Sequence, residues 1–286
     1  MRWTLALAGL AASWGFVAVL VAAVDLGAPS LALLRLAIAT VTVGAVAAIA
    51  RADVRPGGRL GVLVLLGALQ AAHWLLFFET VKLGSVALAV LTFYTAPILL
   101  AATAPRVLGE TTSKVVLAAL PLGALGITLV ALTGDEGGGH ASAVAIAAGL
   151  GSAATYAALV LVSKRLLHDG TSPLTVALWD CGVGTIVLLP VLGLADRVLP
   201  SGLGDWSAVL ALGIVFTGLS TLAYAAILRH VSAQAAGLLT FLEPVSAVLL
   251  AALLLDDPLT VATLAGGLLV VLAGVLVIRD QRSIAR

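Results

Sequence analysis

The chain has 286 residues, of which 62% are hydrophobic and 10% are charged, and its formal net charge is +1. Because soluble domains carry roughly 25% charged residues, this composition argues against a soluble fold, a disordered chain and a nucleic-acid-binding protein. The single cysteine rules out an intramolecular disulfide and a cysteine-cluster metal site. We therefore predict an all-α polytopic membrane protein that uses no metal and no other cofactor.

Ten apolar segments follow one another along the chain, and each has about the 20 residues that a helix needs to cross a bilayer. They cover residues 3–24, 29–50, 60–79, 85–104, 113–133, 141–163, 172–192, 206–227, 232–254 and 260–278. The loops between them are short, so no soluble domain fits and any activity must lie in the membrane-embedded part. The sequence therefore predicts ten transmembrane helices.

The distribution of lysine and arginine over the loops predicts how these helices are oriented. With the N-terminus inside, twelve of the fifteen basic residues fall on the cytoplasmic side, and two, Lys82 and Arg197, fall outside. The remaining one, Arg35, lies inside a span, and one missed or added span would destroy this asymmetry. We therefore predict that both termini are cytoplasmic and that the protein is a multi-pass protein of the cell inner membrane.

A glycine-rich stretch divides the ten segments into two sets of five. The predicted organisation is a first five-helix repeat at 1–133, a linker at 134–140, a second repeat at 141–280 and a cytoplasmic tail at 281–286. Shifting one half over the other by 147 positions aligns Pro97 with Pro244 without a gap. Because five is an odd number, the two repeats have opposite orientations. Inverted repeats are common in secondary transporters, whose substrate site lies near the membrane midplane.

Several short motifs occur in the order and spacing of a known family. They are Trp14-Gly15, the stretch from Pro29 to Arg35, Pro97 with the ending Leu108-Gly109-Glu110, Tyr156, and Leu242-Glu243-Pro244. Over nearly its whole length the chain resembles the EamA-type members of the drug/metabolite transporter superfamily. It departs from them at Leu255-Asp256-Asp257, where the family commonly has Leu-Gly-Glu. The resemblance implies a ten-helix fold and the export of small metabolites, and it leaves the substrate open.

Four ionisable residues lie inside the predicted spans, where a charge is costly and is a functional candidate by default. Arg35 is a candidate to bind a substrate carboxylate through its bidentate guanidinium. The alternatives are an internal ion pair with Asp180 and a side chain that extends to the membrane surface. Asp180 is also a candidate for substrate binding and proton coupling. His73 can change its charge near neutral pH, and the alternative is a hydrogen-bonded structural role.

The fourth ionisable residue, Glu243, lies just before Pro244 near the middle of span nine. The proline removes one backbone donor and loosens the helix, so freed carbonyls and the carboxylate form a candidate site for a cation, an ammonium group or a proton. The structural alternative is that Glu243 only satisfies the freed backbone groups. Pro97 and Pro244 are predicted to break their helices and to act in gating.

Aromatic residues are scarce, so those inside the spans are candidates to surround a substrate and to stack on an amphipathic or cationic molecule. They are Trp14, Trp74, Tyr94, Tyr156, Trp179 and Tyr224. Ordinary helix packing is the alternative for each of them.

Signature motifs of metalloproteases, α/β-hydrolases, P-loop proteins and dinucleotide-binding enzymes do not occur in the sequence. We therefore predict no enzyme and no use of ATP. The sequence favours a secondary transporter that exports small amphipathic metabolites, amino acids or related compounds, by alternating access, with proton coupling resting on Glu243 and Asp180. A multidrug or organic-cation exporter is the alternative, and a polytopic enzyme acting on lipid-linked substrates is a weaker one. The expected partners are a small-molecule substrate and the lipid bilayer, without nucleic acid, and the oligomeric state stays open.

Overall fold

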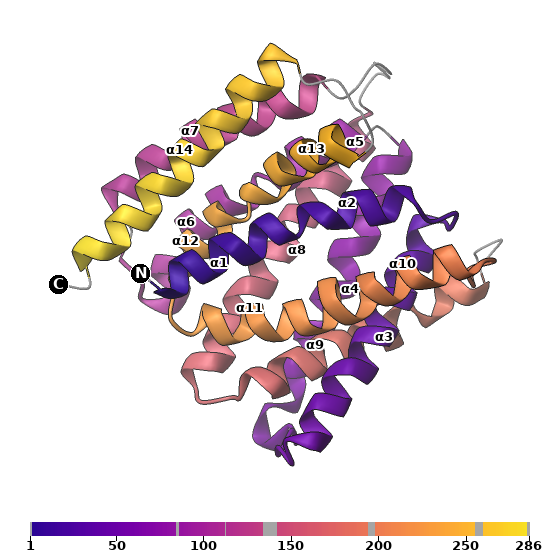
Figure 1. Ribbon diagram of the computed structural model, residues 1–286. Helices are drawn as coiled ribbons and strands as arrows, with labels where there is room; N and C mark the ends of the chain where they lie inside the picture. Colours follow the sequence, from indigo (N-terminus) through magenta and orange to yellow (C-terminus); the bar gives the residue numbers. More distant parts are fainter. Residues whose placement is uncertain are drawn as a thin grey trace.

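The computed structural model describes residues 2–83, 86–111, 113–133, 142–193, 198–254 and 260–284. Within these ranges the chain is helical and contains no strand (Figure 1). The α-helices are α1 (Arg2–Ser13), α2 (Gly15–Ala22), α3 (Ala28–Ile49), α4 (Leu60–Leu83), α5 (Val86–Phe93), α6 (Ala96–Leu108), α7 (Lys114–Thr133), α8 (Ala143–His168), α9 (Pro173–Leu188), α10 (Leu203–Gly213), α11 (Ser220–Leu228), α12 (Ala233–Leu239), α13 (Leu242–Leu254) and α14 (Val261–Ile284). Short 3₁₀ segments are η1 (Gly57–Arg59) and η2 (Leu189–Gly193), and η3 (Ile214–Leu219) is a π-helix.

These helices overlap the apolar segments predicted from the sequence, and several of the predicted segments are divided between two or more helices. Among the described residues, seven helical segments are long and apolar enough to cross a membrane, namely Arg2–Ala22, Ala28–Ile49, Gly57–Leu83, Leu88–Leu108, Ala143–His168, Leu203–Leu228 and Ala233–Leu254. Two further apolar helices, Lys114–Leu129 and Pro173–Leu188, are shorter. The prediction of an all-helical polytopic membrane protein is confirmed at this level. The predicted linker at 134–140 lies outside the described residues.

The surface of the bundle is strongly apolar. Ile49 is 86% exposed, Leu203 is 91% exposed and Val261 is 84% exposed, and many other leucines and valines lie on the outside. A soluble protein exposes few contiguous apolar side chains of this size. Lipid rather than water is therefore the medium that this surface suits.

Local signals in the sequence explain where several helices begin and end. Ser142, Ser172 and Ser232 each stand at an N-cap position, and each side chain accepts a hydrogen bond from the backbone N–H three residues later. At the other end of a helix, Gly109 adopts φ 69° and stops α6, since a left-handed residue of this kind commonly terminates a helix.

Two of the predicted spans, the fourth and the ninth, are interrupted within the described residues. Span four breaks at Tyr94 and Thr95 between α5 and α6, and span nine breaks at Thr240 and Phe241 between α12 and α13. Pro97 and Pro244 stand in the first turn of the helix that follows each break. Proline is tolerated there because the first N–H groups of a helix have no intrahelical acceptor.

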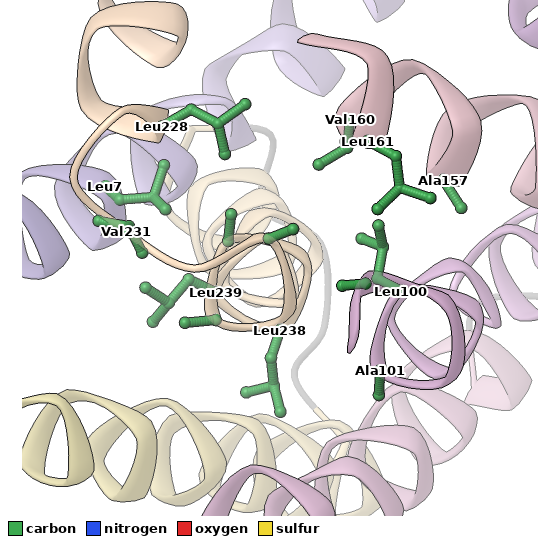
Figure 2. Close-up of a cluster of buried hydrophobic side chains, with 14 of the residues drawn as sticks. Leu7, Leu100, Ala101, Ala157, Val160, Leu161, Leu228, Val231, Leu238 and Leu239 are labelled. Atoms are coloured by element: carbon green, nitrogen blue, oxygen red, sulfur yellow. The ribbon is translucent and has the colours of Figure 1, made fainter. Parts of the chain in front are cut away.

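The short helix α12 forms the centre of the main hydrophobic core. All seven of its residues are buried. Figure 2 shows α12 nearly end on, with Leu238 and Leu239 between Leu7 of α1 on one side and Leu100 of α6 on the other. Because α12 is surrounded by helices of both halves of the chain, the break in span nine, at Thr240 and Phe241, is buried, and the first residues of α13 that follow it are half-buried.

The remaining helices form layers around this core. Helix α4 packs against α8 and α9, while α7 and α14 run side by side along one edge of the bundle (Figure 1). The beginning of α1 and the end of α14 lie at the same end of the molecule in this view.

A buried charge cluster holds the turn between α11 and α12 at this same end. Lys164 is 3% exposed, and its Nζ donates hydrogen bonds to the carbonyl oxygens of Leu228 (2.6 Å) and Val231 (2.5 Å). Its ion-pair partner Glu110, at 3.7 Å, accepts hydrogen bonds from the backbone N–H of Ala233 at the start of α12. We call these two side chains and the turn the Lys164 cluster. It links the ends of α6 and α8 to the α11–α12 turn.

Candidate functional site

Arg35 lies in α3 and is held from two sides. Its Nε donates a hydrogen bond to Thr217 Oγ1 at 3.1 Å, and its guanidinium carbon lies 5.2 Å from the centre of the Trp74 ring. That position over the ring face is typical of a cation–π contact. The terminal nitrogens Nη1 and Nη2 make no hydrogen bond to any residue that the structure describes. The guanidinium therefore retains an unused pair of donors.

Glu243 brings a carboxyl group within electrostatic range of Arg35. Its carboxylate interacts electrostatically with Arg35 and with the hydroxyl groups of Tyr94 and Tyr156. Arg35 and Glu243 do not form a direct ion pair within the described chain. The two charges thus belong to one site, and neither neutralises the other by contact.

A continuous set of aromatic rings adjoins these charges. His73 lies 5.1 Å from Trp74, 5.1 Å from Phe93 and 5.4 Å from Tyr156, measured between ring centres. Phe93 contacts Tyr94 at 5.2 Å, which brings the cluster to the break in span four. Rings of this kind provide a large apolar surface with negative faces, which suits an amphipathic or cationic molecule.

Trp14 and Tyr224 form a second aromatic pair close to Tyr156. Their rings are 5.9 Å apart, and the Trp14 indole donates a 2.5 Å hydrogen bond to Ser220 Oγ. The Tyr224 hydroxyl is buried and lies near the hydroxyl of Tyr156. Trp14 itself lies at the interruption between α1 and α2.

Asp180 does not pair with Arg35, so the ion pair considered from the sequence is absent. Asp180 is 4% exposed in α9, and its Oδ1 has no hydrogen-bond partner in the described part of the chain. Arg35 instead turns toward Thr217 and Trp74. The structure therefore contains two separate carboxyl groups: Asp180 is buried in α9, whereas Glu243 is half-buried and interacts electrostatically with the arginine.

Two other predicted residues have clear structural partners. His73 Nδ1 lies 2.9 Å from Ser152 Oγ, which joins α4 to α8. The Trp179 indole donates a 3.0 Å hydrogen bond to the carbonyl oxygen of Val54 in the loop before η1. Trp179 takes part in none of the ring contacts that link the other aromatic candidates within the described residues. Of the predicted set, it lies apart from the Arg35 and Glu243 region.

A groove of about 210 Å³ lies beside the Trp14 and Ser220 contact. Its lining is Leu10, Ser13, Val215, Phe216, Leu219, Ser220 and Ala223. No charged residue lines it, so it offers an apolar surface and two hydroxyl groups, and the charges of the candidate site lie elsewhere.

Thr217 is the residue of the site that the sequence analysis did not select. It lies in the π-helical segment η3, where its hydroxyl also donates to the carbonyl oxygen of Leu212 at 2.8 Å. A threonine in an apolar span is common, so composition alone gives no reason to choose it. The flanking glycines, Gly213 and Gly218, are the signal that marks a close helix contact there.

Comparison with known proteins relates the sequence of this chain to a family. The sequence pattern of the EamA-like transporter family matches residues 1–132 and again residues 143–279. An uncharacterised transporter of Archaeoglobus fulgidus is 30% identical over 223 residues, which cover 78% of this chain and 77% of that protein. The uncharacterised transporter YxxF of Bacillus subtilis is 26% identical over 184 residues, covering 62% of this chain and 57% of that protein.

The fold also matches a solved structure. A protein of known crystal structure superposes on this chain with a TM-score of 0.86, covering 97% of this chain and 98% of the other. The two sequences are 19% identical, so this likeness concerns the fold alone.

Proposed function

Because this chain belongs to the EamA-like transporter family, we propose that it is a secondary transporter that exports small amphipathic metabolites across the cytoplasmic membrane. Amino acids and closely related compounds are the proposed substrate class. Export proceeds by alternating access, in which the substrate site opens first to one side of the membrane and then to the other. The same membership favours a transporter over an enzyme.

One observation carries the substrate class: Arg35 and Glu243 share an aromatic site without forming a direct ion pair. The free Nη1 and Nη2 atoms of Arg35 match a carboxylate, and the Glu243 carboxylate matches an ammonium group. The rings of Trp74, Tyr94 and Tyr156 match an apolar side chain. A zwitterion with an apolar side chain complements all three features at once.

The architecture that we propose is a pair of inverted five-helix repeats, residues 1–133 and 141–280, with both termini in the cytoplasm. The family pattern matches the two halves separately, which supports a repeat. The breaks near Pro97 and Pro244 occur at equivalent positions of the two halves, and interrupted helices commonly flank the substrate site of such transporters. The excess of basic residues in alternate loops supports the orientation.

Proton coupling is assigned to Glu243 and Asp180. Glu243 interacts electrostatically with Arg35, so a change in the charge of Glu243 alters the site that receives the substrate. Asp180 is buried without a partner for its Oδ1, so a bound proton is the simplest way to satisfy it in a low-dielectric interior. These are the two groups whose protonation can be linked to the transport cycle.

Flux measurements in proteoliposomes test this proposal. Radiolabelled leucine, phenylalanine and threonine are compared with tetraphenylphosphonium, with and without a pH gradient. Arg35→Ala and Glu243→Gln should each reduce amino-acid flux at least tenfold, while the exposed-surface variant Leu203→Ala should match the wild type. Unchanged flux in both site variants would refute the assigned site. Competition between amino acids and unrelated organic cations would favour a multidrug exporter, and loss of the pH-gradient effect in Asp180→Asn would support its coupling role.

A further inference from the structure

The π-helical segment η3 interrupts span eight next to Arg35. Thr217 accepts the Arg35 Nε hydrogen bond at 3.1 Å and donates its own hydroxyl proton to Leu212, five residues earlier, at 2.8 Å. Both roles of the hydroxyl are therefore occupied, which fixes its orientation. Segments of π-helix are rare and occur frequently at functional sites.

The segment η3 is pressed against α3, the helix that carries Arg35. A methyl group added at Gly213 would lie 2.6 Å from Ile38 Cβ, and one added at Gly218 would lie 3.2 Å from the Cα of Ala39. A side chain would fit at Gly213 only if Ile38 moved, and at Gly218 only if the neighbouring atoms of α3 shifted by a few tenths of an ångström. Because η3 and α3 are so close, the Thr217 hydroxyl reaches the side chain of Arg35, which leaves α3 one turn before Ile38 and Ala39. The close contact also fixes the position of η3 along α3.

The Arg35 guanidinium is consequently fixed on two of its sides. Thr217 occupies Nε, and the Trp74 ring covers one face at 5.2 Å. The edge that remains is the one formed by Nη1 and Nη2. A planar carboxylate binds to that edge through two parallel hydrogen bonds, whereas an amine or a neutral amide cannot reproduce the pair.

We propose that Thr217 is a positioning residue for substrate selection: by holding Arg35 Nε, it presents the Nη1–Nη2 edge to a substrate carboxylate. The inference rests on the proposed function, since it concerns the same site. It assigns the choice between an amino acid and its decarboxylated amine to the Thr217–Arg35 contact. Glu243 and the aromatic rings bind the parts that both molecules share.

Transport kinetics separate this role from a packing role. Thr217→Val keeps the shape of the side chain and removes the hydroxyl, Thr217→Ser keeps the hydroxyl, and Thr42→Val is the matched control. Among the described residues, the Thr42 hydroxyl donates only to the Ile38 carbonyl oxygen of its own helix, at the same α3–η3 contact. For Thr217→Val, the KM for phenylalanine should rise about tenfold, the value expected for a loss of about 1.4 kcal/mol.

The remaining kinetic values follow from the same reasoning. The KM for phenethylamine and the maximal rates should change less than twofold in Thr217→Val, and Thr217→Ser and Thr42→Val should both resemble the wild type. If the KM for phenylalanine and for phenethylamine rise together, or if neither changes, Thr217 does not select the carboxylate and the proposal is wrong.

A second measurement needs no transport at all. In protein labelled with [¹⁵N]arginine in nanodiscs, the Arg35 Nε–H resonance is identified by its loss in Arg35→Lys. It should exchange slowly with water in the wild type and in Thr217→Ser, and shift and exchange faster in Thr217→Val. An identical resonance in Thr217→Val would overturn the positioning role. Failure of the wild type to transport any amino acid would refute the proposed function, while the resonance still decides whether Thr217 positions Arg35.

Discussion

The Lys164 cluster allows a stability prediction that can be worked out from individual contacts. In Lys164→Met the side chain keeps its length and apolar stem but loses its charge and its donors. The carbonyl oxygens of Leu228 and Val231, which are bonded at 2.6 Å and 2.5 Å in the native protein, are then left without this donor. The ion pair with Glu110 at 3.7 Å is lost as well.

The magnitude follows from opposing terms. A hydrogen bond from a charged donor contributes about 1.5–3 kcal/mol. The positive charge is also attracted to the negative C-terminal end of the α11 dipole, which adds to the stability. Against this, an ammonium group that is 3% exposed has lost its hydration, and methionine does not carry that cost. We expect a net destabilisation of about 3 kcal/mol, near the lower limit for breaking a buried charge pair.

Glu110→Gln should cost less, about 1 kcal/mol. The glutamine carbonyl can still accept the hydrogen bond from Ala233 N–H at the start of α12, as a capping group does. The double variant should be less destabilised than the sum of the two single variants, because each single change already breaks the same ion pair. A coupling of roughly 0.5–1.5 kcal/mol is expected.

The single cysteine makes the measurement direct. Cys181 is fully buried in α9, so a thiol-reactive dye reports unfolding during a thermal ramp of detergent-solubilised protein. With about 2 °C per kcal/mol for a chain of this size, Lys164→Met should melt about 6 °C below the wild type and Glu110→Gln about 2 °C below it. If Lys164→Met melts within 1 °C of the wild type, the cluster contributes no net stability and the reasoning fails.

Three further predictions concern residues outside the Arg35 contact. Trp179→Phe should lower the free energy of unfolding by about 1 kcal/mol through loss of its hydrogen bond to Val54, without changing the KM for any substrate. A raised KM would show that Trp179 belongs to the substrate site. Asp180→Asn should leave the melting temperature within 2 °C of the wild type, since Oδ1 has no partner to lose, and a larger fall would reveal a missed contact. Gly126→Ala should destabilise the protein by about 1–3 kcal/mol, because its methyl group would lie 2.6 Å from the Gly266 carbonyl oxygen. Gly9→Ala is the control and should be neutral or stabilising, since open space surrounds Gly9. Equal melting temperatures for the two variants would show that α7 and α14 separate without cost.

The helical segments and the special residues within them follow from the sequence. Runs of about 20 apolar residues can only be helical in a bilayer, because each backbone N–H and C=O must find its partner within the segment. Arg35 and Glu243 stand out for a similar reason, since a charge at that depth is costly unless it has a partner or a role. The prolines at 97 and 244 mark the interrupted helices because a ring without an N–H weakens the local backbone.

The tertiary structure decides which of these groups meet. Arg35 turns to Thr217, Trp74 and Glu243 rather than to Asp180, because the rotation of each helix about its axis is set by packing along its whole length. The π-helical segment η3 and the burial of Lys164 likewise depend on residues far apart in the chain, such as Ile38 against Gly213. An apolar sequence in lipid has little patterning to specify one face over another, so side-chain partners emerge only when the helices are packed together.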